Sequence, residues 1–211
     1  MAKIKAVIFD MDGVLIDAKD WHYEALNRAL NHFGFNISRY DHLVTFDGLP
    51  TRKKLEMLTR EHGLPAALHG FINDLKQIYT TELVHSRCKP VFQHEYALSN
   101  LHSMGYKIAI ASNSVRDSIK LMMSRSNLDQ YLDGIVSNED VKHGKPDPEI
   151  YHKAMDLLGM KPEECLVLED NKHGIAAARA AGAHLLIVEQ TTDVTLDAIM
   201  DHIQDAERRG A

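Results

Sequence analysis

The sequence lacks most of the features that mark secreted, disulfide-linked or membrane-spanning proteins. Only 2 of its 211 residues are cysteines and neither belongs to a C-x-x-C pair, which fits a reduced compartment. No apolar run approaches the roughly 20 residues that a transmembrane helix requires, and the N-terminus does not have the layout of a signal peptide. We therefore expect a cytoplasmic protein with no membrane partner.

The charge balance argues against a second broad class, the nucleic-acid-binding proteins. The chain has 24 Lys and Arg against 30 Asp and Glu, a net charge of −6 at pH 7, and no basic patch is visible. Its 13 histidines are scattered, without the H-x-H or H-E-x-x-H pairs of common zinc sites. What remains is the composition of an ordinary soluble protein, long enough for one core domain with an insert.

Five short apolar runs, most of them separated by helical patterns, predict the fold class. They lie near residues 4–9, 107–111, 134–137, 165–168 and 184–188. Strands that alternate with helices are typical of βαβ units. The sequence thus predicts an α/β protein with a Rossmann-like parallel sheet core flanked by helices.

One long stretch interrupts this alternation. From about Ala18 to His85 the apolar residues recur at helical spacing, and no strand pattern is present. We expect residues 1–16 and 88–211 to form the core and residues 17–87 to form an inserted helical-bundle cap. A small lid of this kind beside a reactive site can exclude water and select the substrate.

The most informative motif is Asp10-Met11-Asp12-Gly13, directly after the first apolar run. Two carboxylates two residues apart, at the end of a strand, can serve as a nucleophile and an acid/base pair in phosphoryl transfer. Taken alone, the motif is equally typical of an ordinary turn, because Asp and Gly are common in turns.

Three further groups follow, each near the end of a strand-like run: Ser112-Asn113-Ser114, Lys145 and Glu169-Asp170. Ligands of open α/β sheets bind at the carboxyl ends of the strands, so we expect these groups to form one site with the first motif. A hydroxyl, a cation and two acidic clusters suit a phosphoryl group bridged to a divalent metal.

Together the four motifs resemble those of the haloacid dehalogenase superfamily of phosphotransferases. The resemblance is to its β-phosphoglucomutase-like branch, in which a helical cap follows the first motif. It covers nearly the whole chain, and its motifs are residues 10–17, residues 112–114, Lys145 within Lys-Pro-Asp-Pro, and residues 169–175.

This resemblance implies roles for the residues that contact the transferred group. Asp10 would be the nucleophile that forms an aspartyl-phosphate. Asp12 would be the general acid for the leaving oxygen and then the general base. Ser112, the amide of Asn113 and Lys145 would hold the remaining phosphoryl oxygens.

The resemblance also implies Mg²⁺ as the cofactor. Asp10, the backbone carbonyl of Asp12 and Asp170 would bind the ion, and Glu169 would bind it directly or support the other ligands. Such hard oxygen ligands are those that Mg²⁺ prefers.

Four residues are candidates for substrate recognition. Trp21-His22 resembles an aromatic-His pair of the mutases, and Arg52 lies in a loop that resembles one supplying an Arg to a distal phosphate. Lys76 resembles a cap lysine, with altered spacing, and Val115-Arg116 stands where the mutases have Lys-Asn. The alternatives are a helix-surface histidine for His22, helix-start arginines for Arg52 and Arg116, and a surface i,i+3 pair for Lys76 with Tyr79.

These motifs predict a Mg²⁺-dependent phosphatase that acts on a small-molecule phosphate ester, a sugar or polyol phosphate, as a monomer or weak dimer. The presence of Asp12 argues against a dehalogenase, because the dehalogenases of the superfamily lack an acid at that position. A β-phosphoglucomutase-like hexose-phosphate mutase is the alternative. A non-catalytic sugar-phosphate-binding protein on the same fold also stays open.

Overall fold

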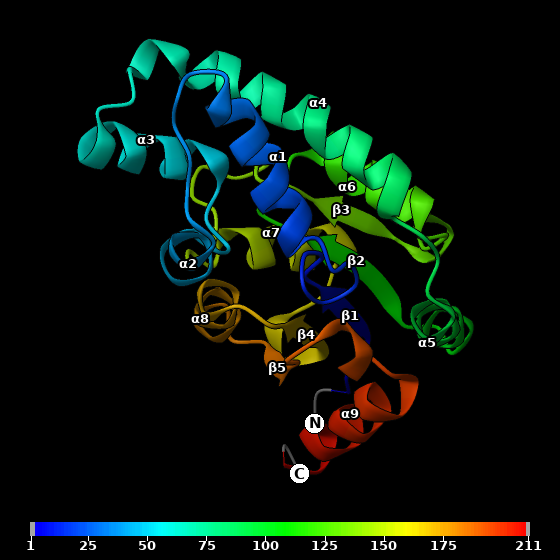
Figure 1. The fold of residues 1–211 in the computed structure, drawn as a ribbon. Helices are drawn as coiled ribbons and strands as arrows, with labels where there is room; N and C mark the ends of the chain where they lie inside the picture. Colours follow the sequence, from blue (N-terminus) through cyan, green and yellow to red (C-terminus); the bar gives the residue numbers. More distant parts are fainter. Residues whose placement is uncertain (1–2, 210–211) are drawn as a thin grey trace. The chain divides into compact units, whose positions relative to one another are not determined.

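The computed structural model describes residues 3–209, which divide into two compact units (Figure 1). The sheet unit combines the residues up to 17 with those from 89 onward, and the helical unit comprises residues 18–88. Within the described residues, no helix has the length and apolar character needed to cross a bilayer.

The sheet unit contains one parallel sheet of five strands in the order β3-β2-β1-β4-β5. The strands are β1 (Ala6–Phe9), β2 (Lys107–Ala111), β3 (Gly134–Val136), β4 (Cys165–Glu169) and β5 (His184–Ile187). Each lies within a residue or two of a predicted apolar run. The predicted Rossmann-like α/β core is therefore confirmed.

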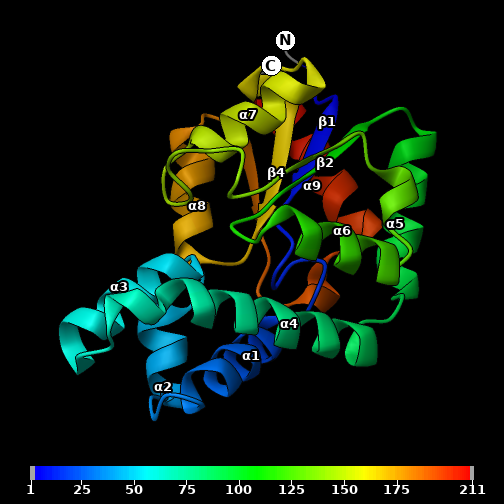
Figure 2. The ribbon, with the colours of Figure 1, turned by 90° about the horizontal axis from the view of Figure 1, so that it is seen from above.

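Helices cover both faces of this sheet (Figure 2). They are α5 (Phe92–Ser103), α6 (Arg116–Arg125), α7 (Glu149–Leu158), α8 (Lys172–Ala180) and α9 (Leu196–Arg209). The short 3₁₀ turns of the unit are η3 (Asp129–Tyr131), η4 (Pro162–Glu164) and η5 (Thr191–Asp193). Helices α7 and α8 pack on one face, and α5, α6 and α9 lie on the other.

Burial on both faces explains the continuous apolar strands. Strands β1 and β4 are buried along their whole length, as expected for central strands of a parallel sheet. Ile8 and Val167 belong to the hydrophobic core between the sheet and helices α7 and α8. Ile150 of α7 and Ala177 of α8 contribute to the same core. This rigid core fixes the strand ends that carry the motifs.

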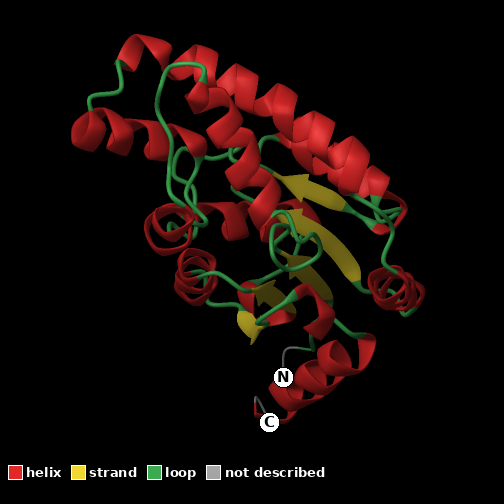
Figure 3. Cartoon of the chain, viewed as in Figure 1, coloured by secondary structure: helices red, strands yellow, loops and turns green. Residues whose placement is uncertain are grey.

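The helical unit has no strand, as expected for residues 18–85 (Figure 3). Its elements are α1 (Lys19–Asn31), α2 (Arg39–Asp41), the π-helical turn η1 (His42–Phe46), α3 (Thr51–His62), the 3₁₀ turn η2 (Ala66–Leu68) and α4 (His69–Arg87). Leu26, Leu30, Leu55 and Ile72 belong to one hydrophobic core, which joins α1, α3 and α4. The helical unit thus has a core of its own.

Candidate active site

The first motif forms a tight loop at the carboxyl end of β1. Asp10 is buried, and its backbone N–H donates to the carbonyl of Leu168 on the neighbouring strand. Gly13 adopts a φ of +95°, which a residue with a β-carbon rarely adopts. Its N–H donates to the carbonyl of Ile16 and closes the loop. Glycine is therefore required here so that the chain can turn directly after Asp12.

The second motif lies at the carboxyl end of β2, the strand beside β1. Ser112 is buried, and its hydroxyl accepts from the N–H of Ser114 at 3.1 Å. The hydroxyl of Ser114 donates to Oδ2 of Asp12 at 2.8 Å. Oδ1 of Asn113 accepts from the backbone N–H of Lys145 at 3.0 Å. The second motif therefore orders both the first and the third.

Lys145 carries the positive charge at the centre of the site. Its side chain is almost completely buried. Its ammonium donates to Oδ1 of Asp10 at 2.5 Å, to Oε1 of Glu169 at 2.6 Å and to the carbonyl of Ala111 at 2.8 Å. Three ammonium hydrogens thus have three acceptors, two of them charged.

Glu169, at the end of β4, is 1% exposed. Its Oε1 accepts from Lys145 and from the hydroxyl of Tyr151 at 2.5 Å. Its Oε2 accepts from the backbone N–H groups of Asp170 and Asn171 at 3.1 and 3.3 Å. Four donors occupy a carboxylate that offers about four acceptor positions, so Glu169 is held in one orientation.

Three carboxylates meet at this edge of the sheet. Asp10, Glu169 and Asp170 each offer an oxygen within 4.8 Å of the others. Carboxylate oxygens at such spacing fit Mg²⁺ by ligand type and by charge. Because the oxygens of Glu169 already accept from four donors, Asp10 and Asp170 are the better direct ligands in this donor set.

The electrostatics of the site follow from burial and from the crowding of charges. Burial raises the pKa of Asp10 well above its usual range; Lys145 opposes this shift, and the carboxylates of Glu169, Asp12 and Asp170 add to it. Burial alone would lower the pKa of Lys145, but Asp10 and Glu169 raise it above its ordinary value. Lys145 therefore stays charged beside the carboxylates.

Arg116, one of the candidate recognition residues, forms an ion pair in the sheet unit. Its guanidinium lies 2.5 Å from Oδ2 of Asp140, and the same oxygen accepts from the N–H and hydroxyl of Ser137 at 2.7 Å. The backbone N–H of Arg116 donates to Glu139. This side chain anchors the start of α6 to the loop after β3.

The helical unit brings together two of its three candidates. Nζ of Lys76 lies 3.4 Å from Nδ1 of His22. The side chain of Arg52, in contrast, is 77% exposed and pairs with Glu56 one helical turn later. The structure thus places Arg52 as a surface residue of α3.

Lys54, two residues beyond Arg52, is the buried cation of α3, with 7% of its surface exposed. Burial lowers the pKa of His42 to about 4, and the nearby ammonium of Lys54 contributes to the shift. The ring of His42 lies 5.0 Å from that of Tyr23. Lys54 is not evident from the sequence, because a run of Arg and Lys at a helix start does not reveal which member is buried.

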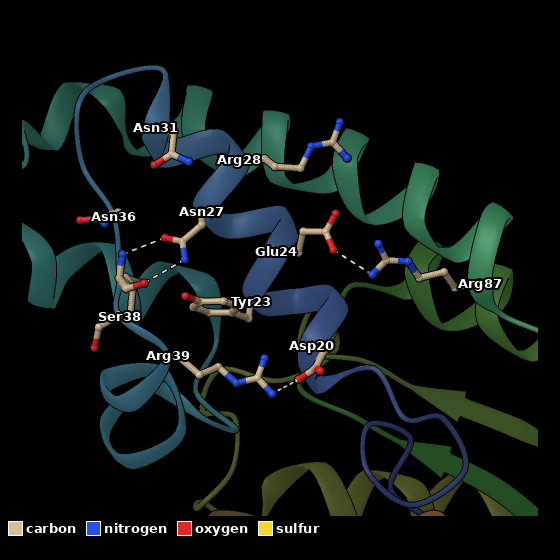
Figure 4. A pocket seen from close by; sticks show the side chains of 11 residues that line it. Asp20, Tyr23, Glu24, Asn27, Arg28, Asn31, Asn36, Ser38, Arg39 and Arg87 are labelled. Atoms are coloured by element: carbon tan, nitrogen blue, oxygen red, sulfur yellow. Dashed lines mark hydrogen bonds and ion pairs between the residues drawn. The ribbon is translucent and has the colours of Figure 1, made fainter.

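A hollow of about 570 Å³ lies on the helical unit (Figure 4). Its arginines are already paired with carboxylates: Arg39 lies 2.5 Å from Asp20, and Arg87 lies 2.8 Å from Glu24. The side chain of Asn27 is bonded to the backbone of Ile37. Motif residues do not line this hollow, and its paired charges offer no set of ligands comparable to the one around Lys145.

Two polar side chains of the site were not predicted. In the sequence, Tyr151 occupies an apolar position of an amphipathic helix, so the pattern does not indicate that its hydroxyl contacts Glu169. Ser114 belongs to the second motif, but the motif alone did not indicate its bond to Asp12. Both contacts depend on how neighbouring elements are brought together, which periodicity does not report.

Comparison with known proteins gives a consistent set of relatives. A family model described as haloacid dehalogenase-like hydrolase matches residues 7–188. The chain is 33% identical over 187 residues to a phosphorylated carbohydrates phosphatase of Thermotoga maritima, which covers 85% of this chain and 82% of that protein. It is 29% identical over 202 residues to the pyrophosphatase PpaX of Bacillus mycoides, covering 90% of this chain and 85% of the relative.

A solved structure agrees with the fold. The β-phosphoglucomutase of Clostridium difficile superposes with a TM-score of 0.84 and covers 96% of this chain and 98% of its own. The sequence identity is 22%, so this likeness concerns the fold.

Proposed function

The chain belongs to the haloacid dehalogenase-like hydrolases, and from that premise we propose that it is a Mg²⁺-dependent phosphatase of a sugar or polyol phosphate. The observation that carries the proposal is the contact between Lys145 and Asp10 at 2.5 Å, beside the buried carboxylate of Glu169 and the partly buried one of Asp170. A buried carboxylate beside a fixed cation suits a nucleophile that must approach a phosphate dianion.

In the first half of the reaction, a carboxylate oxygen of Asp10 attacks phosphorus. An oxygen–phosphorus bond forms to Asp10 as the bond to the leaving oxygen breaks. Asp12 donates its proton to that oxygen, and the product is an alcohol and an aspartyl-phosphate. Lys145, Ser112 and the N–H of Asn113 stabilise the equatorial oxygens of the phosphoryl group.

In the second half, the carboxylate of Asp12 takes a proton from a water molecule whose oxygen attacks phosphorus. The bond between phosphorus and Asp10 breaks and releases orthophosphate. The Asp10 carboxylate and the protonated Asp12 are thereby restored. The bond from Ser114 to Asp12 supports this role, because it orients the side chain that must serve as acid and then as base.

Mg²⁺, when bound, offsets the negative charge of the phosphoryl group and of the nucleophile. We assign its binding to Asp10, Asp170 and the backbone carbonyl of Asp12. Glu169 is assigned a supporting role, because both of its oxygens already accept from donors of the protein. It holds Lys145 and the backbone of Asp170 in position.

The substrate class is supported by the relatives. The name of the Thermotoga maritima protein, 33% identical to this chain, specifies phosphorylated carbohydrates. The helical unit is the proposed cap that selects the substrate, and Lys54 and the Lys76–His22 pair are its candidate polar groups for an anionic, hydroxyl-rich ester. The two cysteines are buried and form no disulfide, which suits a cytoplasmic setting.

A hexose-phosphate mutase is the second candidate. Its support is the resemblance of Trp21-His22 to the aromatic-His pair of the mutases, together with the contact of 3.4 Å between Lys76 and His22. In a mutase, a hydroxyl of a bound sugar phosphate takes the place of water in the second half of the reaction.

Phosphorus NMR with Mg²⁺ and a panel of sugar and polyol phosphates distinguishes these functions. The panel includes β-glucose 1-phosphate with a trace of the 1,6-bisphosphate. Growth of inorganic phosphate, absent from the Asp10→Asn variant, is the expected result. Conversion to glucose 6-phosphate with little free phosphate identifies a mutase instead. Binding of the esters without any conversion identifies a non-catalytic protein and overturns the proposal.

A further inference from the structure

Tyr151 contacts both members of the buried ion pair at the centre of the site. It lies in the first turn of α7 and is fully buried. Its hydroxyl donates to Oε1 of Glu169 at 2.5 Å. The ammonium of Lys145 lies 4.9 Å from the centroid of its ring, within the range of a cation–π contact.

The hydroxyl of Tyr151 and the ammonium of Lys145 share one acceptor. Oε1 of Glu169 accepts from both, at 2.5 and 2.6 Å. Because Oε1 also accepts from Tyr151, it attracts the Lys145 ammonium less strongly. It also restricts rotation of the carboxylate, because each rotation would break a buried, charge-assisted hydrogen bond.

All three hydrogens of the Lys145 ammonium are already donated in hydrogen bonds. Its three acceptors are Asp10, Ala111 and Glu169. A bond to a phosphoryl oxygen must therefore replace one of these bonds. Whether the ammonium turns toward the phosphoryl group or stays with Glu169 depends on how strongly Oε1 attracts it.

The position of Glu169 is also fixed from the other side. A β-carbon added at Gly174 would lie 1.7 Å from Oε1 and 2.3 Å from Oε2, so the start of α8 packs directly against the carboxylate. Tyr151 and Gly174 therefore hold Glu169 between two helices.

We propose that Tyr151 is a positioning residue of the phosphoryl-transfer site. Its hydroxyl holds Glu169 so that the Lys145 ammonium stays directed at Asp10 and the transferred group, and its ring supports the ammonium. This role rests on the function proposed above, since it matters only where Lys145 binds a phosphoryl oxygen.

A double-mutant cycle tests whether Tyr151 acts through Glu169. Tyr151→Phe removes the hydroxyl and keeps the ring, so the core stays filled. We expect it to lower kcat about tenfold, equivalent to about 1.4 kcal/mol, and to lower kcat less than twofold in the Glu169→Gln background. Tyr106→Phe is the matched control, because Tyr106 directly precedes β2 and the site lies at the other, carboxyl end of that strand. It should leave kcat within twofold of the wild type.

Calorimetric titration with orthophosphate supplies a readout that does not depend on turnover. We expect Tyr151→Phe to weaken orthophosphate binding about threefold, with an unchanged circular dichroism spectrum. Equal losses of kcat in both backgrounds contradict action through Glu169. Wild-type kcat and orthophosphate affinity in Tyr151→Phe overturn the proposal.

The two proposals fail in different ways. A wild-type protein that hydrolyses no phosphate ester contradicts the proposed function. In that case the orthophosphate titration decides the role of Tyr151 by itself, and equal affinity in wild type and Tyr151→Phe rejects it.

Discussion

The hydroxyl of Ser114 donates a hydrogen bond of 2.8 Å to Oδ2 of Asp12. This contact joins the loop after β1 to the loop after β2 and holds the proposed general acid by one oxygen. Ser114 lies two residues after Ser112, the serine proposed to bind the phosphoryl group, and its hydroxyl contacts the proposed acid.

Removal of this hydroxyl should separate substrates by their leaving groups. Ser114→Ala leaves Asp12 less well oriented, so hydrolysis of sugar phosphates, whose alkoxide leaving groups need a proton, should fall about tenfold. Hydrolysis of 4-nitrophenyl phosphate, whose leaving group needs little assistance, should fall less than threefold. Ser99→Ala, at a partly exposed position of α5, is the control; equal losses with both esters contradict the assignment.

Gly174 should be intolerant of any side chain. A β-carbon there would lie 1.7 Å from Oε1 of Glu169, whereas at Gly70 it would meet no atom within 4 Å. Both glycines lie within helices, where alanine ordinarily stabilises by up to about 1 kcal/mol. We expect Gly174→Ala to lower kcat at least 100-fold and Gly70→Ala to leave it unchanged.

Steady-state kinetics and thermal unfolding of the two variants provide the measurement. A Gly174→Ala protein with wild-type kcat would show that Glu169 can move without consequence, and its assigned support of Lys145 would then be wrong.

The ion pair between Asp140 and Arg116 should make stability depend on pH in the acid range. Bonds from Arg116 and Ser137 outweigh the effect of burial and lower the pKa of Asp140 to about 2. The pKa of an unfolded Asp is about 3.9, so this stabilisation is complete above that value and is lost as the pH falls toward 2.

We expect Asp140→Asn to lower the free energy of unfolding by about 1–2 kcal/mol at pH 7, after allowance for solvent screening of the partly exposed pair. The loss should be about half as large at pH 3. Urea unfolding at both pH values measures it, with Asp201→Asn on the exposed face of α9 as the control. A loss that does not change with pH would assign the effect to packing instead.

Arg52 and Lys54 should differ in their effect on catalysis. Arg52 is largely exposed and paired with Glu56, and such surface pairs contribute little. Lys54 is buried, so solvent screens its charge less. We expect Arg52→Ala to leave kcat/KM within twofold and Lys54→Met to lower it at least tenfold, mainly through KM. The reverse order of effects would restore Arg52 as the recognition residue.

The core of the fold was predictable because its physical causes are local. Strands buried on both faces are continuous apolar runs, so β1 and β4 were evident. Helix α7 begins after Pro148 and ends at Gly159, which has a φ of +66°, as the two residue types indicate. The motif residues follow strand ends, and a parallel sheet brings those ends to one edge.

The polar contacts between elements were less predictable. A helical wheel places Arg52 and Lys54 at similar angles on opposite sides of the Leu55 and Leu58 stripe, so the pattern did not identify the buried cation. The hydroxyl of Tyr151 was likewise hidden in an apolar stripe. Such contacts depend on the distance and angle between packed elements, which a periodic pattern does not specify.

In the proposed mechanism, Asp10 becomes phosphorylated during turnover. The Asp12→Ala variant should accumulate this intermediate with 4-nitrophenyl phosphate, because that leaving group departs without an acid while the water attack lacks its base. Reaction with Mg²⁺, rapid quenching and borohydride reduction convert an acyl phosphate to an alcohol, and peptide mass spectrometry locates the change.

We predict homoserine at position 10, formed only with Mg²⁺ and absent when Asp10→Asn is added to the same variant. Turnover by a protein whose Asp10 stays unmodified, or a reduced residue at another position, would contradict the proposed mechanism.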